Sequence, residues 1–248
     1  MLFHYEYTSF MRMHRFFIEQ KLQGEKEVLV TDPKLIHQWL NVFRYKWKSK
    51  LVLFDNSGFE FVVEVVSLQN DKAELQIIEE RESSVSTKKD VSLFYAVVKN
   101  KINFEWVLEK GTELGVSNFY PIFTDRSEEK KINLDRSQAI IKESAEQSGR
   151  AKLPLIHETE NLVTALEKKD LFLIAFHAGE GAISWNTFKD NQGLNDAKRI
   201  GIFIGPEGGW SEREVDLFKQ NSIPLVSLGE ATLRAETAAV VASALLLV

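Results

Sequence analysis

Two glycine-containing stretches near the C-terminus hold residue types whose spacing suits the binding of a small ligand. The first, GPEGGW (205–210), directly follows an apolar run that ends at Ile204. Proline fixes one backbone angle, and paired glycines adopt positive φ or let a ligand approach the main chain closely. Ser211 stands three residues before Glu214, which is the spacing of a capping box that begins a helix. The stretch predicts a stiff turn with exposed backbone amides, unless it serves chain geometry alone.

This turn lacks the residues that phosphate-binding loops need. A Walker loop requires Gly-Lys followed by Ser or Thr, and a dinucleotide fold requires G-x-G-x-x-G. Neither pattern occurs here. The turn is therefore better suited to a ligand that backbone groups recognise than to a triphosphate.

The second stretch, SLGEATLRAETA (227–238), again places a glycine directly after a strand-like run, which ends at Leu228. Arg234 and Glu236 stand where the following apolar helix begins. Open α/β sheets bind ligands at the carboxyl ends of their strands, so two such loops at adjacent strand ends predict one pocket. A surface ion pair is the plainer interpretation of Arg234 and Glu236.

The predicted secondary structure that must position these loops follows two different patterns along the chain. Residues 13–80 contain short strand patterns and one helical turn, which together predict a small β-barrel. From residue 91, apolar strands alternate with helices, which predicts a parallel sheet covered on both faces. The first part has predicted strands at 28–30, 50–54, 60–66 and 73–78 and a helix at 33–42. The second has strands at 91–98, 118–123, 171–176, 200–204 and 225–228 and helices at 102–114 and 135–148 and after the last two strands.

The sequence also predicts where the first of these helices ends and where the linker lies. The helix over 102–114 places Ile102, Trp106, Val107 and Leu114 near one face, with Gly115 as its stop. The polar, charged residues 79–90 are the predicted linker.

Composition excludes several classes of protein. The 248 residues are 44% hydrophobic, which is enough to fill real cores. There is no cysteine, which removes disulfides, thiolate nucleophiles and cysteine-based metal sites. The net charge of −5 argues against a uniformly basic nucleic-acid coat. The longest late apolar run, 237–248, is well short of the roughly 20 residues that cross a bilayer, so we expect a cytoplasmic protein without membrane contact.

A local basic patch remains available for nucleic acid in RYKWKSK (44–50). Strand-like alternation would place Arg44, Lys46, Lys48 and Lys50 on one side as a track for phosphates, with aromatic residues between them. An edge strand protected by lysines against aggregation is an equally good interpretation of this stretch by itself.

The two C-terminal stretches together, GPEGGW-S-x-x-E followed by LG-x-x-x-LR-x-ETA, carry a resemblance. They resemble the SPOUT-class methyltransferases, and closely the 16S ribosomal RNA uridine-N3 methyltransferase (RsmE-type) family. The likeness continues in EWVLEKGTELGV (105–116), DRS (125–127), E-x-AEQSGR (143–150) and HRFF (14–17). It therefore covers about residues 13–248.

This resemblance implies a PUA-like β-barrel that binds RNA over 13–80 and a SPOUT α/β domain with a C-terminal deep trefoil knot over 91–248. Residues 1–12 would be an N-terminal extension. It implies S-adenosylmethionine as cofactor, no metal, a homodimer, and methylation of N3 of a uridine in the 16S rRNA of the small ribosomal subunit. The alternatives are another SPOUT enzyme acting on transfer RNA or a ribose hydroxyl, and a knotted RNA-binding protein without catalysis.

The resemblance also suggests roles for individual residues. Arg126 and Arg234 are candidate cations that stabilise negative charge on the uracil, and Glu207 or Glu236 is the candidate base or orienting group. The expected cofactor-binding residues are Phe176, His177, Ile204, Gly205, Pro206, Gly209, Leu228, Gly229 and Leu233. The expected RNA-binding residues are Arg15, Arg44, Lys46, Lys48, Lys50, Lys110, Gln147 and Arg150.

Plainer roles stand beside some of these. Lys110 is well placed to pair with Glu113 within its helix, and Gln147 and Arg150 end a helix whose dipole favours a cation. His177 is more plausible as a neighbour of the cofactor than as a catalytic group.

Overall fold

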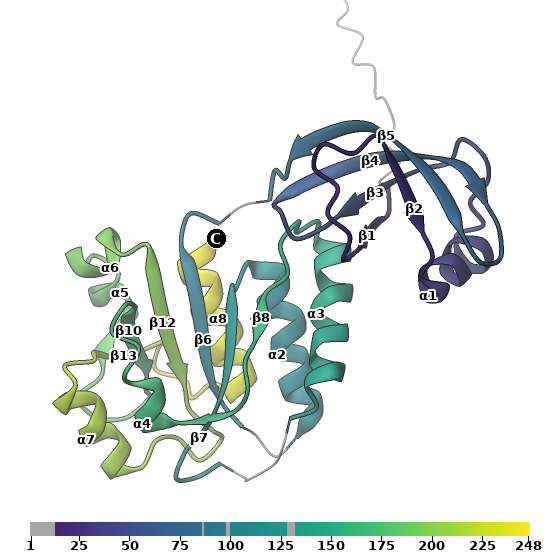
Figure 1. The fold of residues 1–248 in the computed structure, drawn as a ribbon. Coiled ribbons are helices and arrows are strands. Elements are labelled where there is room, and N and C mark those ends of the chain that lie inside the picture. The colour runs from purple at the N-terminus through teal and green to yellow at the C-terminus, as the bar shows by residue number, and fades with distance from the viewer. Residues whose placement is uncertain (1–12, 86, 98–99, 128–131) are drawn as a thin grey trace, which may run out of the picture. The chain divides into compact units, whose positions relative to one another are not determined.

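The chain forms two compact units, divided between Ser84 and Val85 (Figure 1). The structure is a computed structural model that describes residues 13–85, 87–97, 100–127 and 132–248. The predicted extension at residues 1–12 lies outside the described residues. Residue 98 of the predicted strand at 91–98 and residue 86 of the predicted linker also lie outside them. Each unit has its own hydrophobic core.

The first unit is a five-stranded sheet with one short helix. The strand order is β1-β3-β4-β5-β2, and every pair is antiparallel except β1 and β3. Phe16 and Trp39 lie at the centre of its core, in edge-to-face contact. The elements are β1 (Arg15–Phe17), β2 (Glu27–Val30), α1 (Pro33–His37), the π-helix η1 (Gln38–Val42), β3 (Lys50–Phe54), β4 (Phe59–Leu68) and β5 (Ala73–Glu82). Closure of this sheet into a barrel stays a prediction.

Strand β5 runs four residues further than its sequence pattern predicts. Residues 79–82 have the polar composition of a linker, yet they pair with the first half of β4. Arg81 holds this end of the sheet, because its guanidinium donates to the buried carboxylate of Glu60 at 2.9 Å. Cross-strand pairing of charged side chains therefore outweighs the low strand propensity of the segment.

The second unit is an open sheet in which all the recorded strand pairs are parallel, as predicted. The strand order is β11-β13-β10-β12-β6-β7-β8, and β9 pairs with β7. The strands are β6 (Asp90–Ala96), β7 (Asn118–Phe123), β8 (Leu155–Ile156), β9 (Glu160–Asn161), β10 (Phe172–Phe176), β11 (Ile183–Ser184), β12 (Arg199–Ile204) and β13 (Leu225–Ser227).

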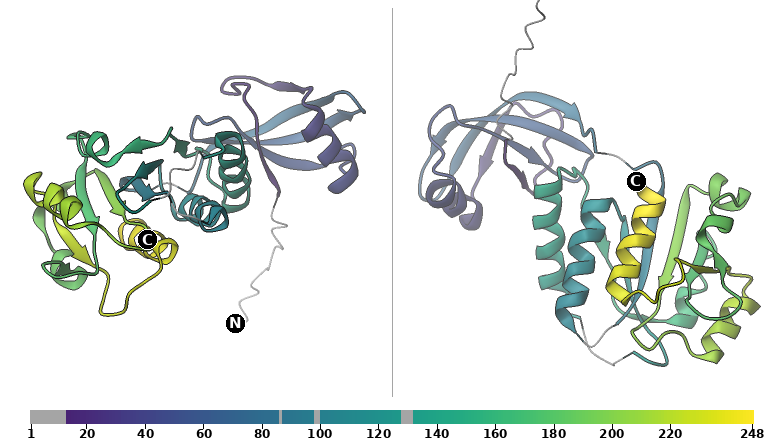
Figure 2. Two further views of the ribbon diagram at one scale, coloured as in Figure 1. Left: turned by 90° about the horizontal axis from the view of Figure 1, so that it is seen from below. Right: turned by 180° about the vertical axis from the view of Figure 1, so that it is seen from behind.

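Helices cover both faces of this sheet, which confirms the predicted layering. Helix α8 lies beside α2, and α2 beside α3, on one face (Figures 1 and 2). Strand β12 alternates between the faces: Ile202 belongs to the core with α2 and α8, and Phe203 to the core with α7. The helices are α2 (Lys101–Leu114), α3 (Leu134–Ser148), α4 (Leu162–Ala165), α5 (Trp185–Phe188), α6 (Gln192–Asp196), α7 (Glu212–Gln220) and α8 (Ala235–Leu247).

Helix α2 ends at Gly115 as predicted, with the glycine in the left-handed region at φ 112°. Its buried face is only partly the predicted one. Val107 is buried, but Ile102 is 73% exposed and Trp106 is 38% exposed. The buried stripe runs instead through Phe104, Leu108 and Gly111, which face the neighbouring elements.

Candidate functional site

The first glycine stretch forms the turn from β12 to α7. Ser211 caps α7: its hydroxyl accepts from the amide of Glu214 at 3.2 Å, and the Glu214 carboxylate accepts from the amide of Ser211 at 2.8 Å. The predicted capping box is thereby confirmed. Trp210 fastens the turn to β10, since its indole N–H donates to the carbonyl of Phe176 at 2.8 Å. A Cβ on Gly205 would lie 3.1 Å from this indole, which explains the glycine.

The second glycine stretch forms the loop from β13 to α8. Gly229 has a φ of 146°, a conformation that residues with a side chain rarely adopt. The hydroxyl of Ser227 bonds to the carbonyl of Gly229 at 2.9 Å and tightens the loop. Arg234 is the N-cap residue of α8, yet no side chain caps this helix. The amides of its first turn therefore have no side-chain acceptor within the described structure.

The two loops do not follow adjacent strands, and this part of the sequence interpretation is wrong. Strand β10 lies between β12 and β13, and pairs with both in parallel. The chain leaves β12, forms α7 and returns on the far side of β10, a long-range step that residue patterns do not reveal. A third strand end, at Phe176 and His177, is therefore interposed between the glycine loops.

These three strand ends enclose a cavity of about 410 Å³, within the size range of small-molecule sites. Each of the nine predicted cofactor-binding residues lines it. Glu207 and Arg234, two of the four predicted catalytic residues, line it as well. The walls are mostly apolar side chains and main chain, which suits a ligand held by backbone groups.

The other two predicted catalytic residues approach this region from elsewhere. Arg126 follows β7, and its guanidinium donates to the carbonyl of Gly208 in the first glycine turn at 2.5 Å. Glu236 lies in the first turn of α8. Its Oε2 atom is buried and has no hydrogen-bond partner in the described structure.

Tyr95 on β6 is a site neighbour that sequence reasoning missed. Its hydroxyl is buried without a hydrogen-bond partner among the described residues. Burial raises the pKa of this phenol well above its ordinary value, and the nearby carboxylates of Glu236 and Glu207 raise it further. Tyr95 lies within an apolar strand whose composition predicts only a place in the hydrophobic core. Nothing in the neighbouring sequence therefore indicated that it lies near the site.

His177 lies in the pocket wall, at the end of β10. Burial lowers the pKa of its imidazole, and the charge of Lys219 lowers it further. A Cβ on Gly179 would lie 2.3 Å from its Nε2 atom, so the following glycine leaves room for the ring. The neutral form of the imidazole is therefore favoured in the folded protein.

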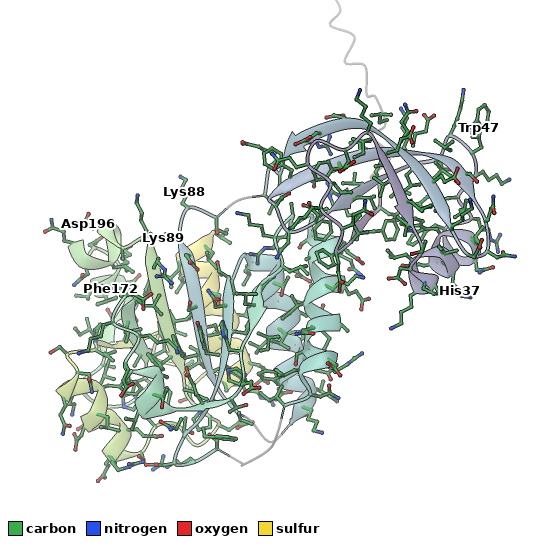
Figure 3. All side chains as sticks on the ribbon, viewed as in Figure 1. His37, Trp47, Lys88, Lys89, Phe172 and Asp196 are labelled. Carbon is green, nitrogen blue, oxygen red and sulfur yellow. The ribbon has the colours of Figure 1, made fainter. Side chains whose placement is uncertain are left out.

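Three of the predicted RNA-binding residues of the first unit, Arg44, Lys46 and Lys48, are exposed, but they do not lie on a strand. Residues 44–49 form a loop with a turn, in which Arg44 and Lys48 adopt positive φ, and Lys50 begins β3. The backbone amide of Lys48 donates to the carbonyl of Val65 at 2.9 Å and fixes the turn. Trp47 extends outward from the first unit at this turn (Figure 3). It is 68% exposed, and the Lys48 ammonium lies 4.4 Å from the centroid of its ring. We call residues 44–49 the cationic loop.

Two other predicted RNA contacts, Arg15 and Lys110, have protein partners, and a third, Gln147, lies in a cavity wall. Arg15 donates to Glu60 at 2.9 Å. Lys110 pairs with Glu109 and Glu113, the plainer role that the helix spacing suggests. Gln147 lines a second cavity of about 290 Å³ between α2 and α3.

Arg150 is buried, which corrects its prediction as an RNA contact. Its guanidinium donates to the carbonyls of Thr112 and Val116 at 3.1 and 2.7 Å, at the C-terminal end of α2. Burial lowers its pKa to about 10. Arg150 therefore stabilises the fold, and its buried side chain is not offered to RNA.

The described part of the chain contains no group of three or more His, Cys, Asp or Glu side chains that could hold a metal ion. No helix among these residues has the length and apolarity needed to span a bilayer.

Comparison with known proteins gives consistent matches. The family described as RNA methyltransferase domain matches residues 85–247. Ribosomal RNA small subunit methyltransferase E of Mesomycoplasma hyopneumoniae is 30% identical, covering 92% of this chain and 96% of the relative. The protein of the same name from Bacillus subtilis is 28% identical, covering 91% and 93%.

Solved structures match over similar lengths. The Neisseria gonorrhoeae ribosomal RNA small subunit methyltransferase E bound to S-adenosylmethionine has a TM-score of 0.83 and 26% identity, covering 94% of this chain and 95% of that one. A putative methyltransferase from Legionella pneumophila with bound S-adenosylmethionine has a TM-score of 0.82 and 25% identity, covering 95% and 97%.

Proposed function

The chain belongs to the ribosomal RNA small subunit methyltransferase E family, and on that premise we propose that it methylates N3 of a uridine in 16S rRNA with S-adenosylmethionine. The observation that carries the proposal is the cavity at the ends of β10, β12 and β13, lined by each of the nine residues expected to bind the cofactor. We place the reaction in the cytoplasm, on the small ribosomal subunit.

The pocket fits S-adenosylmethionine in size and in chemistry. Apolar residues such as Ile204, Leu228 and Leu233 offer a surface for the adenine ring. The N-terminus of α8 opens on the pocket without a side-chain cap, and such a helix end favours a carboxylate like that of the methionine part. When bound, S-adenosylmethionine supplies an electrophilic methyl group on a sulfonium.

The residues of this chain have to align the uracil and make its N3 nucleophilic. N3 carries a proton, so a base must accept that proton, and cations must stabilise the negative charge on the flanking carbonyl oxygens. Glu207 is exposed at the pocket, where it can accept a proton from the substrate. Arg234 and Arg126 supply the positive charge, and half-buried Glu236 orients the groups around it.

We further propose that the second unit contains the trefoil knot of the SPOUT class. Helix α8 supports this proposal, because it follows β13 at the far side of β10 yet packs against α2, β6 and β12. The chain after β13 must therefore return across the sheet. In the same scheme the first unit is the PUA-like RNA-binding domain, and its cationic loop supports that role.

A homodimer is the third part of the proposal. Helix α8 is mostly apolar after its first turn but only partly buried: Leu245 is 44% exposed, and Val240 and Val241 are half-buried. Exposed apolar surface of this kind marks interaction sites. A second copy that covers α8 and the neighbouring exposed residue Trp106 of α2 would bury it.

The test is methyl transfer to small ribosomal subunits with purified protein and isotopically labelled S-adenosylmethionine, followed by mass spectrometry of the 16S rRNA. We expect one N3-methyluridine per subunit. Arg234→Gln should lower the rate by about 100-fold or more, because it removes charge stabilisation in the transition state. Methylation of transfer RNA or of a ribose oxygen instead would move the protein to another SPOUT activity. Cofactor binding without transfer to any RNA would indicate a binding protein.

A further inference from the structure

The buried carboxylate of Glu214 joins the two loops that carry the pocket and Arg126. We infer that Glu214 is a positioning residue that holds Arg126 against the pocket, an assignment that rests on the function proposed above. Glu214 lies in the first turn of α7 and is 1% exposed. A charged group this deeply buried is costly unless it is fully hydrogen-bonded, so its partners matter.

Each oxygen of Glu214 has a backbone amide as its partner. Oε2 accepts from the amide of Ser211 at 2.8 Å, which is the capping function. Oε1 accepts from the amide of Asp125 at 2.8 Å, in the loop that follows β7. A cap alone needs one oxygen. The second ties the α7 end of the glycine turn to a segment 89 positions away in the sequence.

The side chain of Asp125 adds a second tie between the same two segments. It accepts from the hydroxyl of Ser211 at 2.6 Å and forms a salt bridge with Arg213. The bonds from Arg213 and Ser211 hold the pKa of Asp125 below its usual value. The loop after β7 is therefore fastened through both its main chain and a side chain.

Arg126 is the next residue, and it lies directly on the glycine turn. Its guanidinium donates to the carbonyl of Gly208, and a Cβ on Gly208 would lie 3.3 Å from the Cδ atom of Arg126. Gly208 is part of the pocket wall, and its lack of a side chain leaves room for the aliphatic part of the Arg126 side chain. The hydrogen bonds and the salt bridge of Asp125 thus determine where the guanidinium of Arg126 lies relative to the pocket.

This arrangement has a kinetic consequence. A catalytic group displaced by about 1 Å can cost on the order of 100-fold in rate, even when the displaced contact is remote from the chemistry. Glu214 is not among the residues that line the pocket. Removal of its carboxylate should therefore slow methyl transfer without lowering the affinity for the cofactor.

The first test is Glu214→Gln in the full-length protein. Its amide group presents one acceptor and one donor to two N–H donors, so one of the two bonds must be lost. We expect kcat for methyl transfer to fall by about 10-fold to 100-fold, while the affinity for S-adenosylmethionine, measured by calorimetry, changes less than about threefold. The matched control is Asn191→Ala, which removes the side-chain cap of α6 (Asn191 Oδ1 to the amide of Leu194, 3.2 Å) far along the chain from these loops. It should leave both quantities unchanged.

A double-mutant cycle with Arg126→Ala separates positioning from general damage. If Glu214 acts through Arg126, Glu214→Gln should cost less than about twofold once Arg126 is absent. An equal loss in both backgrounds would overturn the inference. Asp125→Asn, which keeps the backbone bond to Glu214 but removes the charge facing Arg213, should give a smaller loss.

Amide hydrogen exchange makes the inference testable without any activity. The amide of Asp125 should be protected in the wild-type protein and exchange faster in Glu214→Ala, which lacks both acceptor oxygens. If the wild-type protein methylates no RNA, the proposed function fails. Amide exchange still tests whether Glu214 links the two loops through the amide of Asp125. Rapid exchange of Asp125 in the wild-type protein, or equal exchange in both, would refute it.

Discussion

The pocket of the second unit and the cationic loop of the first differ in which part of the chain is offered to a ligand. The pocket presents main chain at three strand ends together with apolar side chains. The cationic loop presents the exposed side chains of Arg44, Lys46, Trp47 and Lys48. A main-chain site depends on backbone conformation and therefore on its glycines. A side-chain site depends on summed charge, which salt screens.

The largest effect expected from this contrast is at Gly229. Gly229→Val should weaken S-adenosylmethionine binding by about 10-fold to 100-fold, because a β-branched residue at φ 146° costs on the order of 1–3 kcal/mol. There is open space around this position, so the change acts through the backbone rather than through a clash. Calorimetry with the purified variant measures the effect.

Gly24→Val is the matched control. Gly24 also has a positive φ, 84°, and open space around it, but it lies in the first unit. It should lower the melting temperature as Gly229→Val does and leave cofactor affinity unchanged. If both variants bind S-adenosylmethionine with wild-type affinity, the conformation of the β13 loop does not determine binding.

The contrast also explains which parts of the molecule the sequence could predict. The pocket residues were found because glycines directly after apolar runs are local signals, and the parallel sheet brings strand ends together. The position of β10 between β12 and β13 could not be predicted, since strand order depends on contacts between segments far apart in sequence. The role of Arg150 was missed for the same reason: its partners, Thr112 and Val116, belong to another helix end.

The cationic loop was misassigned for a different reason. Alternating cations and aromatic residues are typical of a strand, but Arg44 and Lys48 adopt positive φ and turn the chain. Non-glycine residues in this region are uncommon, and nothing in their identity indicates it. The bond from the amide of Lys46 to the hydroxyl of Ser49, 2.8 Å, stabilises the turn. The expectation of exposed cations nevertheless holds.

The second prediction addresses this loop together with Lys50, the first residue of β3, which directly follows it. Changing Lys46, Lys48 and Lys50 together to Ala should weaken RNA binding by about tenfold and reduce the slope of log affinity against log salt by about 2, since each phosphate contact to a single strand contributes roughly 0.7. Cofactor affinity should not change, because the variant leaves the pocket intact. Filter binding with a 16S rRNA fragment over a range of salt concentrations measures both quantities.

The control for total charge is the triple change of Lys26, Lys34 and Lys72 to Ala, exposed or half-buried lysines of the same unit outside the loop. An equal reduction of the slope in this control would mean that the loop has no special role and that net charge alone attracts the RNA.

The smallest expected effect is a pH dependence at His177, a residue of the pocket wall whose charge changes near neutrality. Burial and Lys219 lower the pKa of His177 from its ordinary 6.5, so its neutral form is favoured in the folded protein. As the pH falls below 6.5, the unfolded chain takes up this proton before the folded one, and stability decreases. A protonated imidazole would also repel the sulfonium of S-adenosylmethionine, so affinity should fall a few-fold between about pH 7.5 and 5.5.

His177→Asn should flatten that dependence when affinity is measured by calorimetry at each pH. His157→Gln is the control. Burial and the charge of Lys168 lower the pKa of His157 as well. This imidazole stacks on Tyr120, with 3.9 Å between the ring centroids, and does not line the pocket. The control variant should keep the wild-type profile. A steep profile that persists in His177→Asn would assign the titration to another group.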